Sequence, residues 1–482
     1  MSLKFKLSAP MFKVKGTVIQ TLDDWFRHII VFGATGSGKT SGPGWLIRNA
    51  LLADTQDVPG GCGGLVLMAK ASDCAEWIAA CREAGRTDDI VRIAPGTKYG
   101  FNILDWISSW GTDGDRGPIA TVALLEEIAS AVDQGGSDSG GENAFFAGAH
   151  RNKLTNLVML CQLARLSVSL SAMRELSSSA PETLQQVESD TWRRRSACWQ
   201  ALAEASHLTK GDPAARADFR ECRRFHLRDY PSLSSRTRGV VEIMFSSLTQ
   251  PFLTRPLRPL FCEATTVTPE ACFAGKILLI DLPVQEYGLV GKLAALAWKR
   301  AFQLAVMRRT GPLGSLRPVF WFADEAQNFL SASDAEYQAV ARSSGGVTCL
   351  LTQQISSIRD ALGSEDKAEA LLANLMSKWF CQNTGETNSW ASELIGERYV
   401  NIANVNMGRG GSESVDGPAS SHAGISTTEQ KRFYLEPAAF QRLRRGGVEN
   451  DLLVDAVLFA GGKQFPSDQG PAPYRTVTFR QR

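Results

Sequence analysis

The sequence lacks any run of about 18 apolar residues, so it predicts no membrane-spanning helix. It also lacks the pattern of a signal peptide, because its first 16 residues alternate lysine with apolar side chains and have no continuous apolar centre. We expect an edge strand there instead. An excess of either charge is missing too: the net charge is +2 over 482 residues, which confines any nucleic-acid surface to part of the chain.

Signals for metal sites and disulfides are equally absent. The ten cysteines form no CxxC pair and show no ligand spacing, so we predict the reduced, buried thiols of a cytosolic protein. The five histidines are scattered, and we assign them no chemistry. What is present is 44% hydrophobic and 21% charged residues, which is typical of a folded globular chain. The length predicts two or three domains.

The order of the expected elements indicates the fold class. Strands and helices alternate from residue 25 to about residue 105, which predicts a parallel sheet. Residues 117–230 carry apolar side chains at helical spacing, so we expect an all-helical insertion. The alternation of helices and strands then resumes. A Gly/Ser-rich stretch at 407–424 is expected to be a linker before a final helix and strand.

Residues 33–40 read GATGSGKT and match the phosphate-loop pattern GxxxxGK[ST]. The glycines let backbone N–H groups turn inward around phosphate oxygens, while Lys39 reaches the terminal phosphates and the Thr40 hydroxyl ligates magnesium. A chance match in a glycine-rich chain is the alternative, but this loop follows an expected strand and opens a helix. We therefore predict a site for ATP and Mg²⁺. Its nucleotide-binding residues are Gly33, Ala34, Thr35, Gly36, Ser37, Gly38, Lys39, Thr40 and Ser41.

A second motif distinguishes hydrolysing a nucleotide from merely holding it. An apolar strand ends in Asp324 and Glu325. The aspartate can hold the magnesium together with Thr40, and the glutamate can orient and deprotonate the attacking water. The alternative is a strand that is simply capped by two acids. Beside a phosphate loop, the pair favours ATP hydrolysis by an oligomeric motor over a small-molecule kinase.

Two further residues are candidates by their position. Gln353 ends the next expected strand, where its side chain can contact the terminal phosphate; taken alone, it is an ordinary strand-end residue. Arg342 ends the helix before that strand, and such an arginine is usually just solvated. In ring ATPases, however, an arginine of one subunit stabilises transition-state charge in its neighbour's site. The predicted catalytic set is Lys39, Asp324, Glu325, Arg342 and Gln353.

In this order the motifs resemble the TraG/TraD-type coupling ATPases of type IV secretion and conjugation, within the class of hexameric DNA pumps that includes FtsK and HerA. Lys70 ends a strand where the family often has Asp-Pro-Lys, and Ile103 replaces the proline of a family Phe-Asn-Pro-Leu segment. The resemblance covers most of the sequence. The segments that carry it are GATGSGKT (33–40), GFNILDW (100–106), GKILLIDLP (275–283), FWFADEAQNF (320–329), ARSSGGVTCLLTQQISSI (341–358), ANLMSKWFCQNTGETNSWASELIG (373–396) and TEQKRFYLEPAAFQRLRRGG (428–447).

Pattern and resemblance together predict an α/β fold of the P-loop NTPase (RecA-like) kind, with a parallel-sheet core and an inserted all-α domain. The expected first part of the nucleotide-binding domain is 1–116, with the phosphate loop. The all-α insertion is 117–232. The second part of the nucleotide-binding domain is 233–482, with the Asp-Glu motif, the sensor strand and a C-terminal strand.

The resemblance also implies a homo-hexameric ring that uses ATP to thread DNA, or to hand DNA–protein substrates such as a relaxase complex to the components of a secretion channel. Gln353 matches the family's sensing glutamine, and Arg342 matches the arginine contributed to a neighbouring subunit. Family members usually begin with a transmembrane helix pair, which is missing here before residue 33. We therefore expect a cytoplasmic protein without direct membrane insertion. It is a soluble member of the family, one held at the inner membrane by a separate membrane-anchored partner, or one whose anchor has been removed.

A basic stretch of the helical insertion is a candidate DNA surface. Arginines and aromatic rings are interleaved there, a combination that suits a phosphate backbone and stacked bases. The alternative is a solvated helix face with ordinary core aromatics, whose arginines pair with nearby acids. The stretch contains Arg193, Arg194, Arg195, Arg216, Arg220, Arg223, Arg224 and Arg228, with Trp192, Trp199, Phe219 and Phe225.

Three functions stay open on the sequence alone. The first is an ATP-driven DNA translocase. The second is a secretion or pilus-assembly ATPase that acts on protein only, and the third is a low-turnover hub that docks a substrate complex. Intact Glu325 and Arg342 weigh against the hub.

Overall fold

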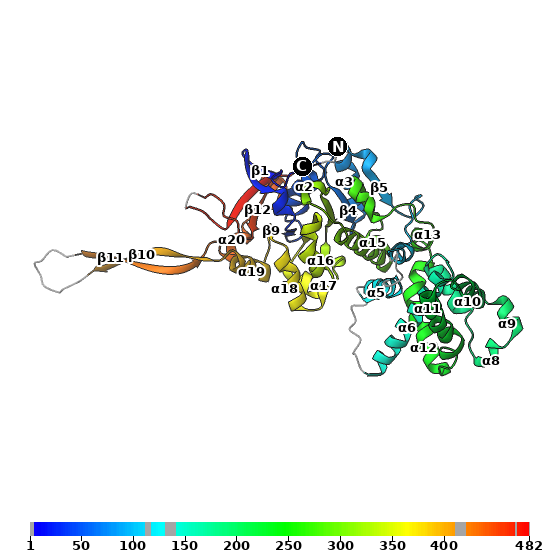
Figure 1. The fold of residues 1–482 in the computed structure, drawn as a ribbon. Helices are drawn as coiled ribbons and strands as arrows, with labels where there is room; N and C mark the ends of the chain where they lie inside the picture. The colour runs from blue at the N-terminus through cyan, green and yellow to red at the C-terminus, as the bar shows by residue number, and fades with distance from the viewer. Residues whose placement is uncertain (1–3, 111–116, 131–140, 410–420, 468–469, 482) are drawn as a thin grey trace, which may run out of the picture.

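The computed structural model of the chain describes residues 4–110, 117–130, 141–409, 421–467 and 470–481. A sheet of nine strands lies at its centre, with helices on both faces. A helical lobe extends from the sheet on one side, and a long two-stranded arm projects on the other (Figure 1). This architecture confirms the predicted α/β class with its parallel-sheet core and inserted helices.

The central sheet places the predicted motifs at one edge. Seven strands, from β9 to β5, are parallel, and two antiparallel strands, β12 and β13, extend the sheet beyond β9. The carboxyl ends of parallel strands share one edge, which is where ligands bind in open α/β sheets. In spatial order the strands are β13 (Tyr474–Arg480), β12 (Leu453–Ala460), β9 (Ser377–Phe380), β3 (Ile29–Phe32), β8 (Gly346–Thr352), β7 (Val319–Ala323), β4 (Gly63–Leu67), β6 (Ile277–Ile280) and β5 (Ile90–Ile93).

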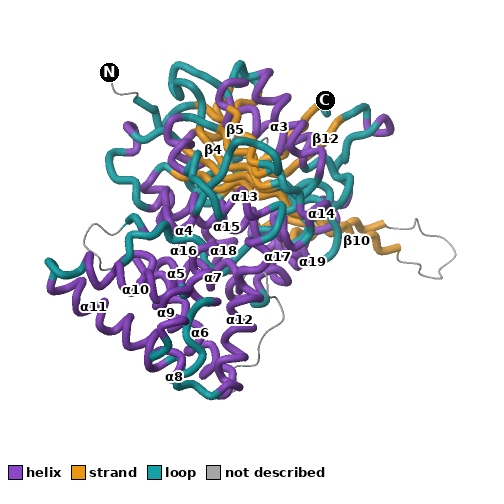
Figure 2. Tube along the Cα trace, turned by 90° about the vertical axis from the view of Figure 1, so that its right-hand side faces the viewer, coloured by secondary structure: helices purple, strands orange, loops and turns teal. Residues whose placement is uncertain are grey.

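The parallel strands are largely apolar because both faces of the sheet are covered. In β3, for example, Ile29 and Val31 enter one hydrophobic cluster, while Ile30 and Phe32 enter the other. The resulting layers of helix, sheet and helix are visible in Figure 2. One face carries α2 (Trp45–Leu52) and α3 (Ala71–Glu83); the other carries α15 (Leu289–Met307), α16 (Asp334–Ala341), α17 (Ile355–Leu362) and α18 (Glu365–Asn374).

The helical lobe follows the sequence prediction with one subdivision. Residues 182–205 have helical spacing without a break in the sequence, but Ser189 and Ser196 each cap a new helix there and divide the stretch. Helix α12 packs on α6 and α7 although it lies beyond residue 232, and the three domain boundaries stay a prediction. The lobe's helices are α4 (Ile103–Ser108), α5 (Gly117–Ser130), α6 (Gly141–Leu163), α7 (Leu170–Ser178), α8 (Leu184–Val187), α9 (Asp190–Arg195), α10 (Ala197–Leu208), α11 (Pro213–Arg224), α12 (Ser235–Leu253) and α13 (Leu257–Phe261).

The two ends of the chain differ from the prediction. The expected N-terminal edge strand is instead a hairpin, because β1 (Pro10–Val14) pairs only with β2 (Thr17–Thr21) in a sheet of its own. Strand β13, whose sequence YRTVTFR alternates as a half-buried strand should, was not predicted. The remaining short helices are α1 (Leu22–Trp25), α14 (Val284–Tyr287), α19 (Glu386–Ile395) and α20 (Pro437–Gln441).

The two-stranded arm corrects the predicted linker at 407–424. Strands β10 (Glu397–Arg409) and β11 (Ser421–Phe433) pair without a break from Glu397 and Phe433 to Arg409 and Ser421. Thirteen residues per strand give a ribbon about 43 Å long, which Figure 1 shows leaving the body of the protein. The linker prediction was therefore wrong for 407–409 and 421–424, and 410–420 lie outside the described residues.

The cysteine prediction is confirmed as far as burial and bonding go, because all ten thiols are free and buried. Burial raises the pKa of several of them, for example that of Cys62 to about 12. In the described part of the chain, no group of three or more His, Cys, Asp and Glu side chains could hold a metal ion. Nor does any helix there combine the length and apolar character that crossing a bilayer requires.

Candidate functional site

The phosphate loop connects β3 to α2 at the carboxyl edge of the sheet, and its backbone requires glycine. Gly36 and Gly38 have φ values of +74° and +82°, in the left-handed region that side chains disfavour. A Cβ atom on Gly33 would lie 2.3 Å from Ser37 Oγ. The loop's tight inward curve therefore follows directly from the positions of its glycines.

The helix predicted after the loop begins with a wider turn. Thr40–Gly44 is π-helical, and the N–H of Gly44 donates to the carbonyl oxygen of Lys39, five residues earlier. Pro43, which has no N–H to donate, lies inside this turn. The regular helix α2 starts only at Trp45. Such π-turns are rare and often mark functional sites.

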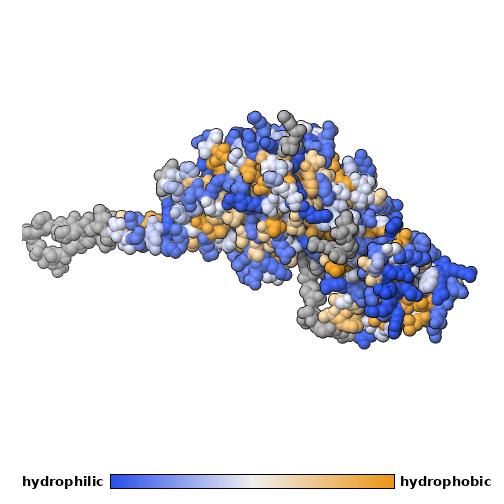
Figure 3. All heavy atoms as spheres, viewed as in Figure 1, coloured by the Kyte–Doolittle hydropathy of each residue, from blue (hydrophilic) through white to orange (hydrophobic). Residues whose placement is uncertain are grey.

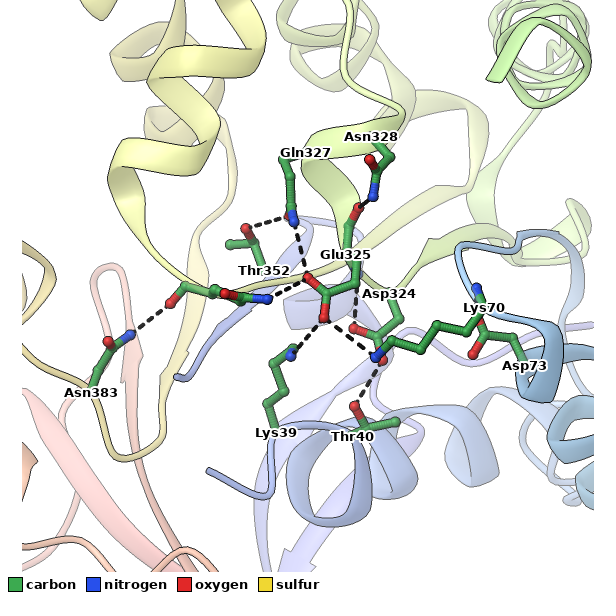
Figure 4. Close-up of polar contacts among 11 residues, drawn as sticks. Lys39, Thr40, Lys70, Asp73, Asp324, Glu325, Gln327, Asn328, Thr352 and Asn383 are labelled. Atoms are coloured by element: carbon green, nitrogen blue, oxygen red, sulfur yellow. Dashed lines mark hydrogen bonds and ion pairs between the residues drawn. The ribbon is translucent and has the colours of Figure 1, made fainter. Parts of the chain in front are cut away.

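The phosphate loop meets the Asp-Glu pair across the sheet edge. The Thr40 hydroxyl donates to Asp324 Oδ2 at 2.8 Å, and Lys39 Nζ donates to Glu325 Oε1 at 3.1 Å (Figure 4). Both carboxylates are buried. Glu325 also has a φ of +49°, which is unusual for a residue with a side chain. Backbone strain of this kind is concentrated at functional sites.

Two amides hold the other oxygen of Glu325. Gln353 Nε2 donates to Glu325 Oε2 at 3.1 Å, and Gln327 Nε2 donates to the same oxygen at 3.0 Å. Gln327 is itself oriented by Thr352, whose hydroxyl donates to its side-chain oxygen at 2.9 Å. Gln353 comes close because β8 lies directly beside β7 and beside β3. The carboxylate of Glu325 is therefore fixed from both sides.

These contacts explain the charge state of Glu325. Burial alone raises the pKa of a carboxyl group, but hydrogen bonding from Gln327 and the charge of Lys39 outweigh it, so the pKa of Glu325 lies below its usual value. Lys70 acts in the same direction from further away. In this arrangement, Glu325 is an ionised carboxylate that already accepts several hydrogen bonds.

Lys70 belongs to this site, although the sequence indicated it only as a family match. Its Nζ lies 3.4 Å from Glu325 Oε1, the same oxygen that Lys39 contacts. Asp73 lies in the first turn of α3 and accepts the backbone N–H groups of Ala69 and Lys70 at 3.0 and 2.9 Å, which fixes the start of the Lys70 side chain. Burial raises the pKa of Asp73 to about 6. No local sequence signal placed Lys70 here, because its role depends on β4 lying beside β7.

A cavity of about 600 Å³ opens in front of these groups. This volume lies within the range of small-molecule sites in proteins. Gln481, just after β13, closes one side and donates to the Ser41 hydroxyl at 3.1 Å. The lining residues include Thr35, Gly36, Ser37, Gly38, Lys39, Thr40, Ser41, Lys70, Glu325 and Gln481.

Arg342 does not join this site within the chain. It lies at the amino end of β8, whereas Gln353 lies at the carboxyl end, about 23 Å away along the seven residues of the strand. Arg342 instead pairs with Asp23 at 3.1 Å, and its side chain is 49% exposed. Of the predicted catalytic residues, the structure thus brings four together and leaves this arginine at the opposite edge of the sheet.

The predicted basic stretch forms an exposed surface, but its phenylalanines are not part of that surface. Phe219 and Phe225 are buried, so the expectation that they stack on bases is wrong. Their hydrophobic faces fill the core of the lobe, as ordinary helix periodicity requires. Trp192 and Trp199 are half-buried and contact each other edge to face.

The arginines of this stretch divide into two groups. Three have partners inside the lobe: Arg193 covers the Trp199 ring, Arg216 donates to Ser206, and Arg224 pairs with Glu221 and Asp229. The face of the lobe visible in Figure 3 is largely hydrophilic. The other five are exposed and form no ion pair with described residues: Arg194, Arg195, Arg220, Arg223 and Arg228.

The doubly wound sheet, its glycine loop after β3 and the acidic pair after β7, two strands away, define the P-loop NTPase class of fold. Residues 318–445 match the family described as "TraM recognition site of TraD and TraG". This match confirms the resemblance to TraG/TraD-type coupling proteins that the motifs predicted. No curated protein matches the chain by sequence.

Solved structures of conjugative coupling proteins share the fold over nearly the whole chain. An unbound form of the bacterial conjugative coupling protein TrwB is 16% identical, with a TM-score of 0.58, over 99% of this chain and 90% of that one. TrwB with the ATP analogue ADPNP is 16% identical, with a TM-score of 0.55, over 100% and 94%. TrwB with ADP and Mg²⁺ is 17% identical, with a TM-score of 0.53, over 99% and 90%. At this identity, the likeness establishes the shared fold.

Proposed function

We propose that this chain is an ATP-hydrolysing motor of conjugative transfer or type IV secretion, which works as a homo-hexameric ring and moves DNA or recruits DNA–protein substrates to the channel. One observation carries the proposal: Lys39 and Thr40 contact Glu325 and Asp324 directly, and Gln353 contacts Glu325 from the adjacent strand. Holding a nucleotide needs only Lys39 and Thr40. A buried, oriented carboxylate beside it supports hydrolysis.

The residues of the cavity fit a nucleoside triphosphate with magnesium. The backbone N–H groups of Gly36, Gly38 and Lys39 donate no hydrogen bond to other described residues, so they are available to phosphate oxygens. Thr40 and Asp324, whose oxygens lie 2.8 Å apart, are hard oxygen donors of the kind that Mg²⁺ prefers. When bound, the ion would neutralise charge on the terminal phosphates.

In the proposed reaction, Glu325 orients a water molecule for in-line attack on the terminal phosphorus and takes its proton. The bond from that phosphorus to the bridging oxygen breaks, and ADP leaves with the electron pair. Lys39 stabilises the charge that develops on the phosphoryl oxygens. Gln353 is placed to register whether the terminal phosphate is present, because its amide already lies against Glu325.

The position of Arg342 supports a ring. It lies at the sheet edge opposite its own phosphate loop, so within a single chain it cannot reach the phosphates. A neighbouring copy could place it against the next site, as in other ring ATPases. When subunits assemble, Asp23 would then lose its ion pair with Arg342, and water would hydrate its carboxylate instead.

DNA-stimulated ATPase activity tests the proposal. We expect duplex or single-stranded DNA to raise phosphate release several-fold, and added salt to abolish the stimulation, because phosphate contacts release counterions. Arg220→Gln combined with Arg223→Gln should weaken the stimulation, while Lys13→Gln on the distant β1–β2 hairpin serves as the matched control. Hydrolysis that ignores DNA would instead favour a motor for protein alone. Negligible hydrolysis under every condition would favour a docking hub.

A further inference from the structure

Two lysines, one in the phosphate loop and one in the turn after β4, contact one oxygen atom of Glu325. Lys39 Nζ lies 3.1 Å from Oε1, and Lys70 Nζ lies 3.4 Å from the same atom. The two ammonium groups are therefore within two hydrogen-bond lengths of each other. Bringing two like charges this close is unfavourable unless an anion lies between them. Here the anion is the Glu325 carboxylate.

The second lysine reaches this point because its backbone is fixed. Asp73 accepts the N–H groups of Ala69 and Lys70, so the turn between β4 and α3 has one defined shape. From this turn the Lys70 side chain extends over the cavity, with 37% of its surface exposed, whereas only 7% of Lys39 is exposed (Figure 4). Lys70 thus approaches from the open side, and Lys39 approaches from inside the loop.

A phosphate oxygen has the same chemistry as the oxygen that lies between these lysines. Both are anionic acceptors of charge-assisted hydrogen bonds. Lys39 is already expected to contact the terminal phosphates. An oxygen of that phosphate that met Lys39 would also be within reach of Lys70, and it would compete with Glu325 for both. A diphosphate lacks this group.

We infer that Lys39 and Lys70 form a clamp for the terminal phosphate of a nucleoside triphosphate, and that Glu325 occupies the clamp when no triphosphate is bound. This inference rests on the proposed function and names what its site selects: triphosphate over diphosphate. When the phosphate displaces Oε1, the amides of Gln327 and Gln353 still hold Oε2 at 3.0 and 3.1 Å. The released oxygen then faces the attacking water. The base is available only when its substrate is present.

Nucleotide affinities of the Lys70→Gln variant test the clamp. We expect the affinity for a non-hydrolysable ATP analogue to fall by about tenfold or more, and the affinity for ADP to change by less than about twofold. Lys70→Arg, which keeps the charge, should recover part of the loss. Lys13→Gln, an exposed lysine of the β1–β2 hairpin, should alter neither affinity. An equal loss for both nucleotides, or no loss, would overturn the clamp.

A double-mutant cycle separates the clamp from a merely structural role of Lys70. Glu325→Gln removes the competing charge, so it should raise the affinity for the ATP analogue when Lys70 is present. In the Lys70→Gln background the same change should have a smaller effect. Equal effects in both backgrounds would mean that Lys70 does not contact the phosphate oxygen that displaces Glu325 Oε1. A wild-type protein that binds neither nucleotide would overturn the proposed function itself, and the clamp with it.

Discussion

At the scale of single residues, Glu325 is the side chain on which the proposed chemistry depends. Glu325→Gln keeps the shape and the hydrogen-bond acceptor but removes the base, so ATP should stay bound while phosphate release falls by about 100-fold or more. Steady-state phosphate release and binding of a fluorescent nucleotide measure the two effects. Glu336→Gln, an exposed carboxylate on α16, is the matched control. Normal turnover by the Glu325 variant would remove Glu325 from the role of base.

The buried histidines make a second prediction at this scale. His28 accepts the Thr348 N–H at Nδ1 and donates from Nε2 to the Gln338 carbonyl, so its neutral form is fully bonded. Burial lowers the pKa of His28 and of His226 to about 4. Between about pH 6.5 and 4 the unfolded chain therefore binds more protons, and stability falls as the pH falls.

Urea unfolding at two pH values checks this linkage. Each histidine should cost about 2 kcal/mol of stability when the pH is lowered from 7 to 5. His226→Gln should remove its share of this pH dependence, even if the variant is less stable at pH 7. An unfolding free energy that does not change over this range would contradict the assigned state of both rings.

Most of the site's residues were predictable from the sequence, because each lies beside a strand end that can be recognised locally. The phosphate loop, Asp324, Glu325 and Gln353 each follow an apolar run. Lys70 and Gln327 were not predicted as partners of Glu325, because their roles depend on the lateral order of the strands and on side-chain direction. Both properties are set by tertiary packing, which no local pattern encodes.

At the scale of elements, the β10–β11 arm shows how composition can conceal structure. Its glycines and serines suggested a linker, yet β10 also contains Val400, Ile402 and Val405, and β-branched residues favour strands. Near the body, the arm is held by Arg398, which covers the Tyr434 ring, and by the pair of Lys431 with Glu397. Described side chains beyond these contacts are largely exposed.

The arm should therefore be removable without loss of the nucleotide site. Replacing residues 400–430 by a short Gly-Asn turn removes no residue of the cavity, so nucleotide affinity and the thermal midpoint of the body should stay close to wild type. Calorimetry and nucleotide titration measure both properties. A large fall in stability would indicate that the arm packs against the body more than the present contacts imply.

At the scale of the whole molecule, the proposed ring and the separation of Arg342 from its own phosphate loop predict that activity depends on assembly. Arg342→Ala should bind ATP normally but hydrolyse it slowly, even in complete rings. When wild-type and variant subunits are mixed in one ring, activity should fall in proportion to the number of subunit interfaces that lack Arg342. Arg27→Ala, which removes the other partner of Asp23, is the control. If Arg342→Ala subunits keep full activity, the assignment in trans is wrong.

The burial of all ten thiols has a practical consequence for studying such an assembly. Thiol reagents attack the exposed thiolate, and these sulfurs are both shielded and shifted toward the protonated form. A single cysteine introduced on the arm or on the exposed arginine face would therefore carry a fluorescent label without removal of the native ones. The native thiols would react only as the chain opens, and so would report unfolding in the same sample.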